Sequence, residues 1–519
     1  MKVIAINSTK WGLAAALAAL SLISPSAIAQ EAAKPRGTLT IGWQWDPGTM
    51  DPQQHRQRFT QIISQAMRDK LVIQQPPGLA SVNLLLDSVT QVDPTHYDIK
   101  IKEGVKFHDG TEMTSDDIVY TFQRLWDPAN KSPRASMGNM TNIEGIAVVD
   151  KYTARWTTKV PFGPVDDAIE GFHLTGQEIL QKAYYEKLTL DEARVAPVMG
   201  AGPFKFVEWI PDQRVVMAAF DDYWQGKPGL DEIIWRTIPE ESTRVAELLA
   251  GSVDMIYPVT PDFVPQLKAA GMKLEIVPGT STRALHMNVR EGSPFHDVEV
   301  RKAMNMAIDK TAITEAIYQG LAIPVEQVTG PGQEGFIEGY DPWPYDQEKA
   351  RAVLSKVTQP IELLTQGQWE IPAEAMAEML RNYGMNVKTV VLETPAFNSI
   401  MEEGTFTLAF AGAGYGSGDF YGAYYNNHFE CSRIETKRVR TGFCEPELDT
   451  KIVAVRNETD PAKRAALLEE VVKLLSETYV PWVPLYDEAE VWAMQPYVNG
   501  FVGSAAGQML NLQNITLAK

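Results

Sequence analysis

The chain has 519 residues and carries 66 acidic against 47 basic side chains, a formal net charge of −19. A negative balance of this size gives no attraction to phosphate backbones or to anionic lipid surfaces, so nucleic acid is not expected as a partner. The length exceeds what a single hydrophobic core usually supports, and we therefore expect two or more structural units.

The first 29 residues have the composition of an export signal. Lys2 and Lys10 precede an apolar run over residues 11–22, and Ala27 and Ala29 provide the small residues of a cleavage point. We therefore predict a signal peptide over residues 1–29, cleaved after Ala29, and a mature protein in the periplasm. A retained anchor is the alternative, but the apolar run is about half as long as a bilayer span requires, so membrane insertion is not expected.

The first predicted element is a strand over residues 38–42, which alternates apolar and polar side chains. It leads into a turn with the sequence Trp43-Gln44-Trp45-Asp46-Pro47-Gly48. Residues 95–102 alternate in the same way and predict a second strand. Thr114 and Asp117 have the spacing of a capping box, which predicts a helix that stops at Asp127, directly before Pro128.

Strands and helices continue to alternate along the rest of the chain. Residues 204–209, 215–220 and 233–238 are predicted strands, and residues 242–250 are a predicted helix closed by Gly251. One long amphipathic helix is expected over residues 298–319, and the Gly- and Pro-rich residues 330–344 predict an ordered loop. Asp460 and Pro461 predict the start of a further helix. The pattern favours an α/β fold with mixed sheets.

Two cysteines, Cys431 and Cys444, lie in a polar, turn-rich stretch of this exported chain. A disulfide is the expected pairing, because oxidising compartments favour it. A metal site or a nucleophilic pair is the alternative, but no C-x-x-C spacing and no nearby pair of histidines accompanies the two cysteines.

The sequence shows no motif that carries catalysis. There is no His-Glu-x-x-His zinc motif and no G-x-S-x-G elbow, and the glycines at 412, 414, 416 and 418 do not complete a phosphate loop or a dinucleotide fingerprint. We therefore expect neither an enzyme nor a bound cofactor or metal. Glycosidase carboxylates need not leave a local signature, so a hydrolase stays open as an alternative.

Several sequence blocks together resemble one family. The run DIKIKEGVKFHDGT over residues 98–111, followed by DDIVY over 116–120, resembles the signature of extracellular solute-binding proteins of the oligopeptide and dipeptide type, which serve ABC importers. Further blocks agree in the same order: GAGPFKF at 200–206, DYW at 222–224, RVAELLAGSVD at 244–254, FHDVEVRKA at 295–303, AIDK at 307–310, DPAKR at 460–464 and VPLY at 483–486. They span essentially the whole mature chain.

The resemblance implies a two-lobed periplasmic-binding-protein fold of type II, in its large three-subdomain variant, with a two-segment hinge. By analogy, lobe I would consist of residues 30–54, 198–284 and 488–519, with an extra subdomain over 55–197. Lobe II would consist of residues 285–487. A small organic solute would be enclosed between the lobes, and the closed form, expected as a monomer, would dock on an inner-membrane ABC permease with cytoplasmic ATPases.

The resemblance also points to residues that hold the solute. Peptide-binding members place an aspartate from a glycine-rich loop against the ammonium group of the ligand, and Asp419 in GYGSGDFY, residues 414–421, stands at that position. Its alternative role is a turn-forming aspartate that binds its own backbone. The usual Asp-Pro-Asp-Asn run is replaced here by Asp419-Phe420-Tyr421-Gly422, which puts peptide specificity in doubt.

Aromatic side chains gather in the same loop and in the first-lobe turn, and flat rings suit apolar side chains, sugar rings or alkylated cations. We expect about half of seven such aromatics to be core residues instead: Trp43, Trp45, Tyr415, Phe420, Tyr421, Tyr424 and Tyr425. Trp45 and Tyr415 are the preferred wall residues. Tyr486 is a further contact by resemblance, Gln44 and Asp46 are candidate hydrogen-bonding residues, and no arginine is assigned to a ligand carboxylate.

The resulting hypothesis is a periplasmic receptor for a peptide-sized organic solute. Candidate solutes are a peptide, an opine-like or sugar-containing conjugate, or an oligosaccharide. A secreted hydrolase for similar molecules is one alternative. A sensor or chaperone module that signals through a membrane partner is another, because it would use the same lobe closure.

Overall fold

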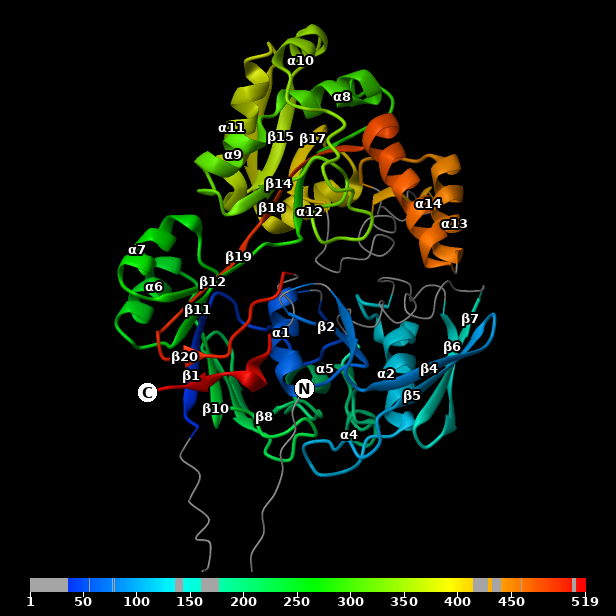
Figure 1. The fold of residues 1–519 in the computed structure, drawn as a ribbon, viewed down its shortest axis with the longest axis vertical. Coiled ribbons are helices and arrows are strands. Elements are labelled where there is room, and N and C mark those ends of the chain that lie inside the picture. The colour runs from blue at the N-terminus through cyan, green and yellow to red at the C-terminus, as the bar shows by residue number, and fades with distance from the viewer. Residues whose placement is uncertain are drawn as a thin grey trace, which may run out of the picture. The chain divides into compact units, whose positions relative to one another are not determined.

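The structure of the protein is a computed structural model that describes residues 36–519 except 56, 77, 79, 136–142, 160–176, 414–427, 432–439, 459 and 506–509. Three larger sheets, flanked by helices, account for most of the described strands (Figure 1). The predicted signal peptide over residues 1–29 lies outside the described residues.

The largest sheet has seven strands in the order β12-β19-β11-β1-β10-β9-β8. Its strands are β1 Thr38–Trp43, β8 Phe204–Ile210, β9 Arg214–Ala219, β10 Glu232–Thr237, β11 Met255–Tyr257, β12 Lys273–Val277 and β19 Glu490–Met494. β1 runs parallel to both β10 and β11, whereas the other pairings are antiparallel. Trp43, Trp235 and Trp492 are buried in its core, where their large apolar surfaces stabilise the fold.

The second sheet has six strands in the order β14-β18-β13-β17-β15-β16. Its strands are β13 Thr282–Met287, β14 Ala322–Pro324, β15 Ile361–Gln366, β16 Val387–Leu392, β17 Leu408–Gly412 and β18 Trp482–Glu488. β15 runs parallel to β16 and β17, and β13 and β18 are antiparallel to their neighbours. Its buried strands are rich in Val, Leu and Ile, the residues that favour a sheet covered on both faces.

The third sheet has four antiparallel strands in the order β4-β5-β7-β6 and carries its own apolar core. Its strands are β4 Leu86–Asp93, β5 His96–Ile101, β6 Ile143–Asp150 and β7 Thr153–Thr158. Two short pairs complete the sheets: β2 Val72–Gln74 with β3 Ser81–Asn83, and β20 Val498–Asn499 with β21 Thr516–Leu517.

Helices connect the strands and cover the sheets. They are α1 Arg58–Met67, α2 Ser115–Trp126, α4 Lys182–Tyr185, α5 Leu190–Val195, α6 Glu241–Leu249, α7 Val264–Ala269, α8 Val298–Ala307, α9 Lys310–Ala316, α10 Gln347–Leu354, α11 Glu370–Arg381, α12 Thr394–Glu403, α13 Pro446–Asn457 and α14 Pro461–Lys473. The single-turn segments are η1 Pro128–Asn130, η4 Pro261–Phe263, η5 Pro294–His296, η6 Gly367–Trp369, η9 Leu474–Tyr479 and η10 Leu512–Asn514.

The α/β class with mixed sheets is confirmed, and so are several local predictions. The Thr114 backbone N–H donates to Asp117 Oδ2 at 2.9 Å, and α2 ends at Trp126 with Asp127 as its C-terminal cap. Asp460 caps α14 by accepting from the Ala462 N–H at 3.0 Å. The predicted strands agree with β1, β5, β8, β9 and β10 to within one or two residues.

The single long helix predicted over residues 298–319 is wrong. The chain forms α8 and then α9, because Ile308 takes an extended conformation with ψ 115°. Asp309 then caps the second helix, accepting from the Ala312 N–H at 2.8 Å. The apolar stripe continues through the bend, which is why the sequence period alone did not indicate a break.

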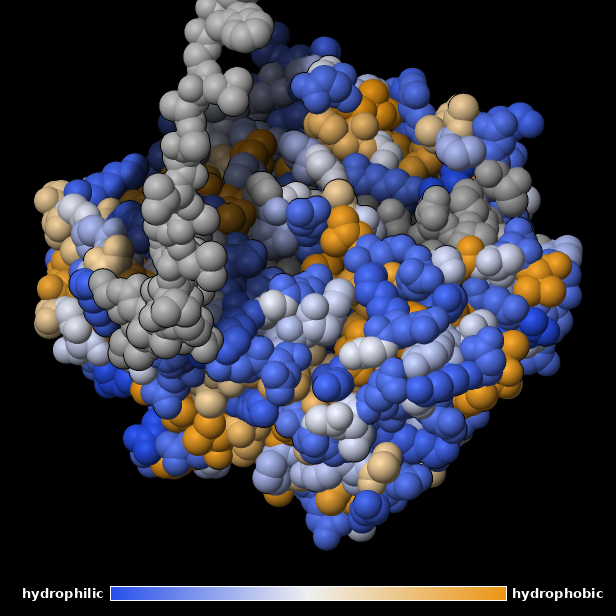
Figure 2. Space-filling model, turned by 60° about the horizontal axis from the view of Figure 1, so that its bottom comes forward, coloured by the Kyte–Doolittle hydropathy of each residue, from blue (hydrophilic) through white to orange (hydrophobic). Residues whose placement is uncertain are grey.

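The molecular surface is largely polar on the face that Figure 2 shows, where apolar side chains appear as small separate areas. Within the part of the chain that the structure describes, no helix combines the length and the apolar composition needed to cross a bilayer.

The two larger sheets are joined at two chain crossings. The chain leaves β12 at Val277 and enters β13 at Thr282, and it leaves β18 at Glu488 and enters β19 at Glu490. The crossings lie side by side, because a Cβ built on Gly279 would stand 1.8 Å from the Glu488 carbonyl oxygen. Only glycine permits this approach. The domain boundaries predicted from the resemblance stay a prediction.

We predict that Gly279→Ala destabilises the protein by about 2–3 kcal/mol, because the added methyl group must push one crossing away from the other. Chemical denaturation of the variant measures this cost. Gly145→Ala on β6 is the matched control, since its Cβ would meet nothing within 4 Å. A Gly279→Ala variant as stable as this control would contradict the close approach.

Asp487, at the end of β18, is a buried carboxyl group beside the same crossings, with 1% of its surface exposed. Burial raises its pKa from 3.8 to about 7, although the Thr282 hydroxyl and the charge of Arg283 act in the opposite direction. The native protein therefore holds a proton that the unfolded chain releases near pH 4. The stability contributed by this group is present below about pH 4 and is lost as the pH rises through about 7.

Asp487→Asn keeps the shape of the side chain but removes its charge at every pH. We therefore predict that the melting temperature of the variant, relative to the wild type, rises more at pH 8 than at pH 5. Differential scanning calorimetry at both pH values tests this. Burial also raises the pKa of Asp69 to about 7, but Asp69 titrates in both proteins and cancels in the comparison. An equal difference at both pH values would show that Asp487 is ionised throughout.

Candidate functional site

The carboxyl ends of parallel strands define one edge on each of the two larger sheets. In the seven-stranded sheet this edge is formed by the ends of β1, β10 and β11, and in the six-stranded sheet by the ends of β15, β16 and β17. Ligands of open α/β sheets bind outside such carboxyl ends. A binding site is therefore expected at these two edges.

Five polar and aromatic side chains meet at the carboxyl edge of the six-stranded sheet: Arg283, Tyr318, Trp369, Tyr486 and Glu488, here named the Arg283 cluster. The strand register brings these side chains together. Arg283 at the start of β13 lies opposite Gly412 at the end of β17 and opposite Tyr486 near the end of β18. Trp369 lies in η6, directly after β15.

The contacts within the Arg283 cluster are specific. Arg283 Nη2 donates to Glu488 Oε2 at 2.9 Å, and the guanidinium carbon lies 4.3 Å from the centre of the Trp369 ring. The Tyr318 hydroxyl donates to Glu488 Oε1 at 3.1 Å and lies 2.8 Å from the Tyr486 hydroxyl. The side chain of Arg283 is 17% exposed and that of Glu488 is 25% exposed, so the ion pair is partly shielded from water.

The electrostatics of the cluster keep Arg283 charged and the tyrosines protonated. Burial by itself would lower the pKa of Arg283, but the Glu488 carboxylate more than offsets this, and the pKa lies above its ordinary value. Burial also raises the pKa of Tyr318 and, more strongly, that of Tyr486. The cluster therefore contains a charged guanidinium that is paired with the Glu488 carboxylate, together with neutral hydroxyl groups.

The predicted residues after β1 are divided between core and surface. Trp43 is 1% exposed and packs against Trp235, Tyr257 and Trp492, which favours the core interpretation for this residue. Trp45 is 37% exposed, with its ring centre 6.0 Å from that of Trp43.

The two polar candidates of this turn also differ. Asp46 Oδ1 accepts from Trp209 Nε1 at 3.0 Å and from the Asp212 N–H at 2.9 Å, and Oδ2 accepts from the Gly48 N–H, so the carboxylate holds the turn together. Gln44 is half-buried at the carboxyl edge of the seven-stranded sheet. Ligand contact by Trp45, Gln44 and Asp46 stays a prediction.

The structure describes only some of the remaining predicted residues. Tyr486 is fully buried and belongs to the Arg283 cluster. Asp419, Tyr415, Phe420 and Tyr421 lie outside the described residues, as do Tyr424 and Tyr425. Cys431 and Cys444 form the predicted disulfide.

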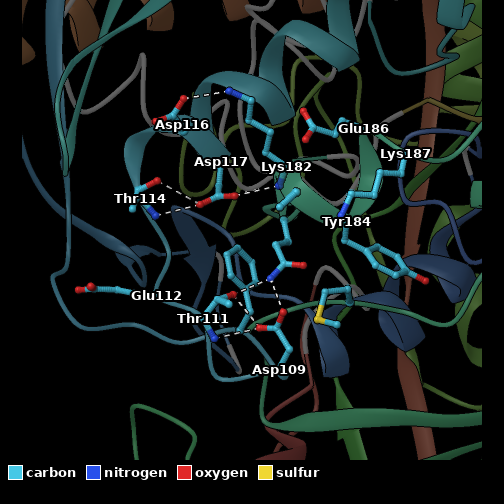
Figure 3. A pocket seen from close by; sticks show the side chains of 14 residues that line it. Asp109, Thr111, Glu112, Thr114, Asp116, Asp117, Lys182, Tyr184, Glu186 and Lys187 are labelled. Atoms are coloured by element: carbon cyan, nitrogen blue, oxygen red, sulfur yellow. Dashed lines mark hydrogen bonds and ion pairs between the residues drawn. The ribbon is translucent and has the colours of Figure 1, made fainter.

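A separate hollow of about 410 Å³ lies beside the four-stranded sheet and is lined by the block that resembles the family signature (Figure 3). Its three aspartates are engaged in local bonds. Asp109 accepts from Gln181 Nε2 at 2.8 Å, Asp117 accepts from the Lys182 N–H at 2.9 Å, and Asp116 pairs with Lys182 Nζ at 3.0 Å. The signature residues therefore build and brace this part of the fold.

Among the described residues, no group of three or more His, Cys, Asp and Glu side chains is arranged to hold a metal ion. The Arg283 cluster combines a charged guanidinium, an aromatic ring and two hydroxyl groups, of which that of Tyr486 belongs to a fully buried side chain.

Sequence reasoning missed Arg283, Tyr318, Trp369 and Glu488. Arg283 and Trp369 are far apart in the sequence and come together only through the pairing of β13, β17 and β15. A usable signal was present, because Gly367-Gln368-Trp369 directly follows a buried strand that belongs to a parallel set.

Curated relatives resemble this chain over most of its length. The glutathione-binding protein GsiB of Pectobacterium atrosepticum is 27% identical over 513 residues, which is 95% of each chain. The heme-binding protein A of Haemophilus influenzae is 27% identical over 448 residues, which is 80% of each chain.

Solved structures show the same fold. The ABC transporter-associated periplasmic binding protein DppA of Helicobacter pylori, in complex with the peptide STSA, superimposes with a TM-score of 0.80 and 23% sequence identity. The similarity covers 93% of this chain and 98% of that one. The periplasmic-binding-protein fold expected from the resemblance is thereby confirmed.

The match to a protein family settles which group the chain belongs to. The family model for "Bacterial extracellular solute-binding proteins, family 5 Middle" matches residues 81–432, which is well over half of the chain. The protein therefore belongs to the bacterial extracellular solute-binding proteins of family 5.

Proposed function

We propose that the protein captures a peptide-sized organic solute with a free ammonium group and releases it, chemically unchanged, to an inner-membrane permease. Family 5 proteins are solute-binding proteins of ABC transporters. The permease would be driven by cytoplasmic ATPases, and the protein would act in the periplasm as a monomer after cleavage behind Ala29.

The observation that carries this proposal is the end-to-end similarity to GsiB, which covers 95% of both chains. Its name assigns glutathione to that relative, and the DppA structure contains the peptide STSA. Both molecules are peptides with an amine and a carboxylate. A similar solute is therefore the first candidate for this protein, although a heme-binding name among the relatives shows that ligands differ within the group.

The proposed mechanism is capture by lobe closure. Residues 30–54, 198–284 and 488–519 would form lobe I, with the extra subdomain over 55–197, and residues 285–487 would form lobe II. Two crossings join the two larger sheets, which is the connection that a hinge requires. A solute that contacts both lobes selects the closed state, because those contacts exist only when the lobes meet.

The proposed ammonium anchor is Asp419. It lies seven positions after Gly412, the last residue of β17, which is paired with Arg283 at the carboxyl edge of the six-stranded sheet. A carboxylate that binds an ammonium ion forms a charge-assisted hydrogen bond worth about 1.5–3 kcal/mol. Tyr415, Phe420, Tyr421 and Trp45 are proposed to flank the solute with aromatic faces, and Gln44 to supply a hydrogen bond.

Native mass spectrometry of the protein as purified tests the ligand class directly, because a solute enclosed by two lobes can remain bound. A retained mass that corresponds to a peptide or a peptide conjugate supports the proposal. An oligosaccharide mass would contradict it, because such a solute has no ammonium group.

Two further measurements separate binding from other activities. Incubation with a mixture of peptides should leave every peptide intact, and cleavage would indicate a hydrolase. Uptake of labelled peptides should fall in a strain that lacks the gene. Unchanged uptake would favour a sensor or chaperone role.

We predict that Asp419→Ala weakens the binding of an amine-bearing peptide by more than about tenfold, because the ammonium group loses its charged partner. Isothermal titration calorimetry measures the effect, and the melting temperature of the ligand-free variant should stay unchanged. Glu402→Ala, which removes an exposed carboxylate from α12, is the matched control and should bind as the wild type does. Equal affinities for both variants would remove Asp419 from the site.

A further inference from the structure

A hollow of about 420 Å³ lies beside the end of α1 and is here named the Asp69 pocket. Its described lining residues come from three parts of the chain, within the ranges 65–84, 203–225 and 502–514. None of them belongs to the six-stranded sheet or to β1, β10 or β11, so the pocket is separate from both carboxyl edges. Its volume lies in the range of pockets that hold small organic molecules.

Asp69 is the acidic residue of this lining and is only 4% exposed. Its Oδ2 atom accepts from Trp224 Nε1 at 2.7 Å, and its Oδ1 atom accepts from the Tyr223 hydroxyl at 3.3 Å. In the described chain the side chain of Asp69 has no other partner, and neither of these two donors is a cation. A buried carboxylate without a counter-ion is costly, and a cation from outside the chain would lower that cost.

The two basic neighbours of Asp69 are engaged with other groups. Arg68 donates to Ser64 Oγ at 2.9 Å and to the Tyr185 hydroxyl at 2.6 Å. Lys70 Nζ lies 4.0 Å from the buried Glu178 carboxylate. The aspartate is therefore the charged group of the pocket that is left for a ligand.

The pocket also has more acceptor atoms than donors at this place. The Tyr223 hydroxyl has a single hydrogen, which is within reach of both Asp69 Oδ1, at 3.3 Å, and Gln225 Oε1, at 3.2 Å. One of these two oxygen atoms is therefore left to accept from a further donor. A protonated primary amine supplies three N–H donors together with the missing positive charge.

The rest of the lining suits an apolar body behind such an ammonium group. The walls carry apolar side chains from all three parts of the chain: Ile73, Val82, Leu84, Pro203, Leu510 and Leu512. Contact with these side chains would remove the apolar part of a ligand from water.

We propose that the Asp69 pocket is a second ligand site, which binds a small organic amine with an apolar body. The ammonium group would pair with the Asp69 carboxylate and donate to Gln225 Oε1 or to the Tyr223 hydroxyl oxygen. The site is independent of the proposed function, because it shares no residue with the predicted anchor Asp419.

The test compares 2-phenylethylamine with its neutral analogue 2-phenylethanol, by titration calorimetry at pH 8. The mature protein carries Asp419→Ala throughout, which removes the other proposed ammonium anchor. The amine should bind more tightly than the alcohol by about tenfold or more, because only the amine forms a charge-assisted bond. Asp69→Asn should weaken amine binding by about tenfold or more and leave alcohol binding unchanged. Asp222→Asn, an exposed aspartate directly before Tyr223, is the matched control and should bind both probes as the parent does.

The dependence on pH gives a second readout. Burial raises the pKa of Asp69 to about 7, and the bonds from Trp224 and Tyr223 act against this shift. The carboxyl group must release a proton before it can pair with the ammonium ion, so amine affinity should rise about tenfold between pH 6 and pH 8 while alcohol affinity stays constant.

The other titratable groups of the described lining do not mimic this rise. Burial lowers the pKa of Lys70 to about 8, but Lys70 titrates equally in Asp69→Asn, which should show little rise. Burial raises the pKa of Tyr223 far above this range, and Arg68 stays charged throughout.

Val82→Trp keeps Asp69 and blocks the hollow with a large side chain from β3, where Val82 is half-buried. It should abolish amine binding, and it serves if Asp69→Asn does not fold. Equal affinities of the parent protein for amine and alcohol, or no binding of the amine at all, would overturn the proposal. An amine preference that survives in both Asp69→Asn and Val82→Trp would place the amine elsewhere and would overturn it as well.

Discussion

The close packing of the two chain crossings is the constraint on which the rest of the described structure depends. Gly279 lies so near the Glu488 carbonyl oxygen that no side chain fits between them. Directly beyond this contact, Thr282 pairs with Asp487 and Arg283 with Tyr486, so the same approach that joins the two sheets also sets the register of β13 on β18. Every residue of the Arg283 cluster on these strands is placed by that register.

At the carboxyl edge of the six-stranded sheet, each polar or charged group would cost free energy if it were buried alone, but the groups compensate one another when they are buried together. The charge of Arg283 is balanced by Glu488, which also accepts from Tyr318, and the Trp369 ring covers the guanidinium face. Such a network is rigid because each member is held by more than one partner.

The sequence block that resembles the family signature has a structural role in this chain. The residues between Asp109 and Asp117 form turns, a helix cap and bonds to residues 181 and 182, and these contacts line the hollow in Figure 3. His108 adds a contact to the Gly202 carbonyl, where Gly200 and Gly202 pack against the end of α1 too closely for any side chain. A motif can therefore identify a family without marking where its ligand binds.

The sequence by itself determined the family, the α/β class, the helix caps at Thr114 and Asp460 and the disulfide between Cys431 and Cys444, because each depends on neighbouring residues or on a distinctive local pattern. Tertiary structure decided the break between α8 and α9, the burial of Trp43, the structural role of Asp46 and the assembly of Arg283, Trp369 and Glu488. The physical reason is distance along the chain. The pairing of β13 with β17 and β18 brings together residues that are separated by more than eighty positions, whereas periodicity, composition and spacing act only over short stretches.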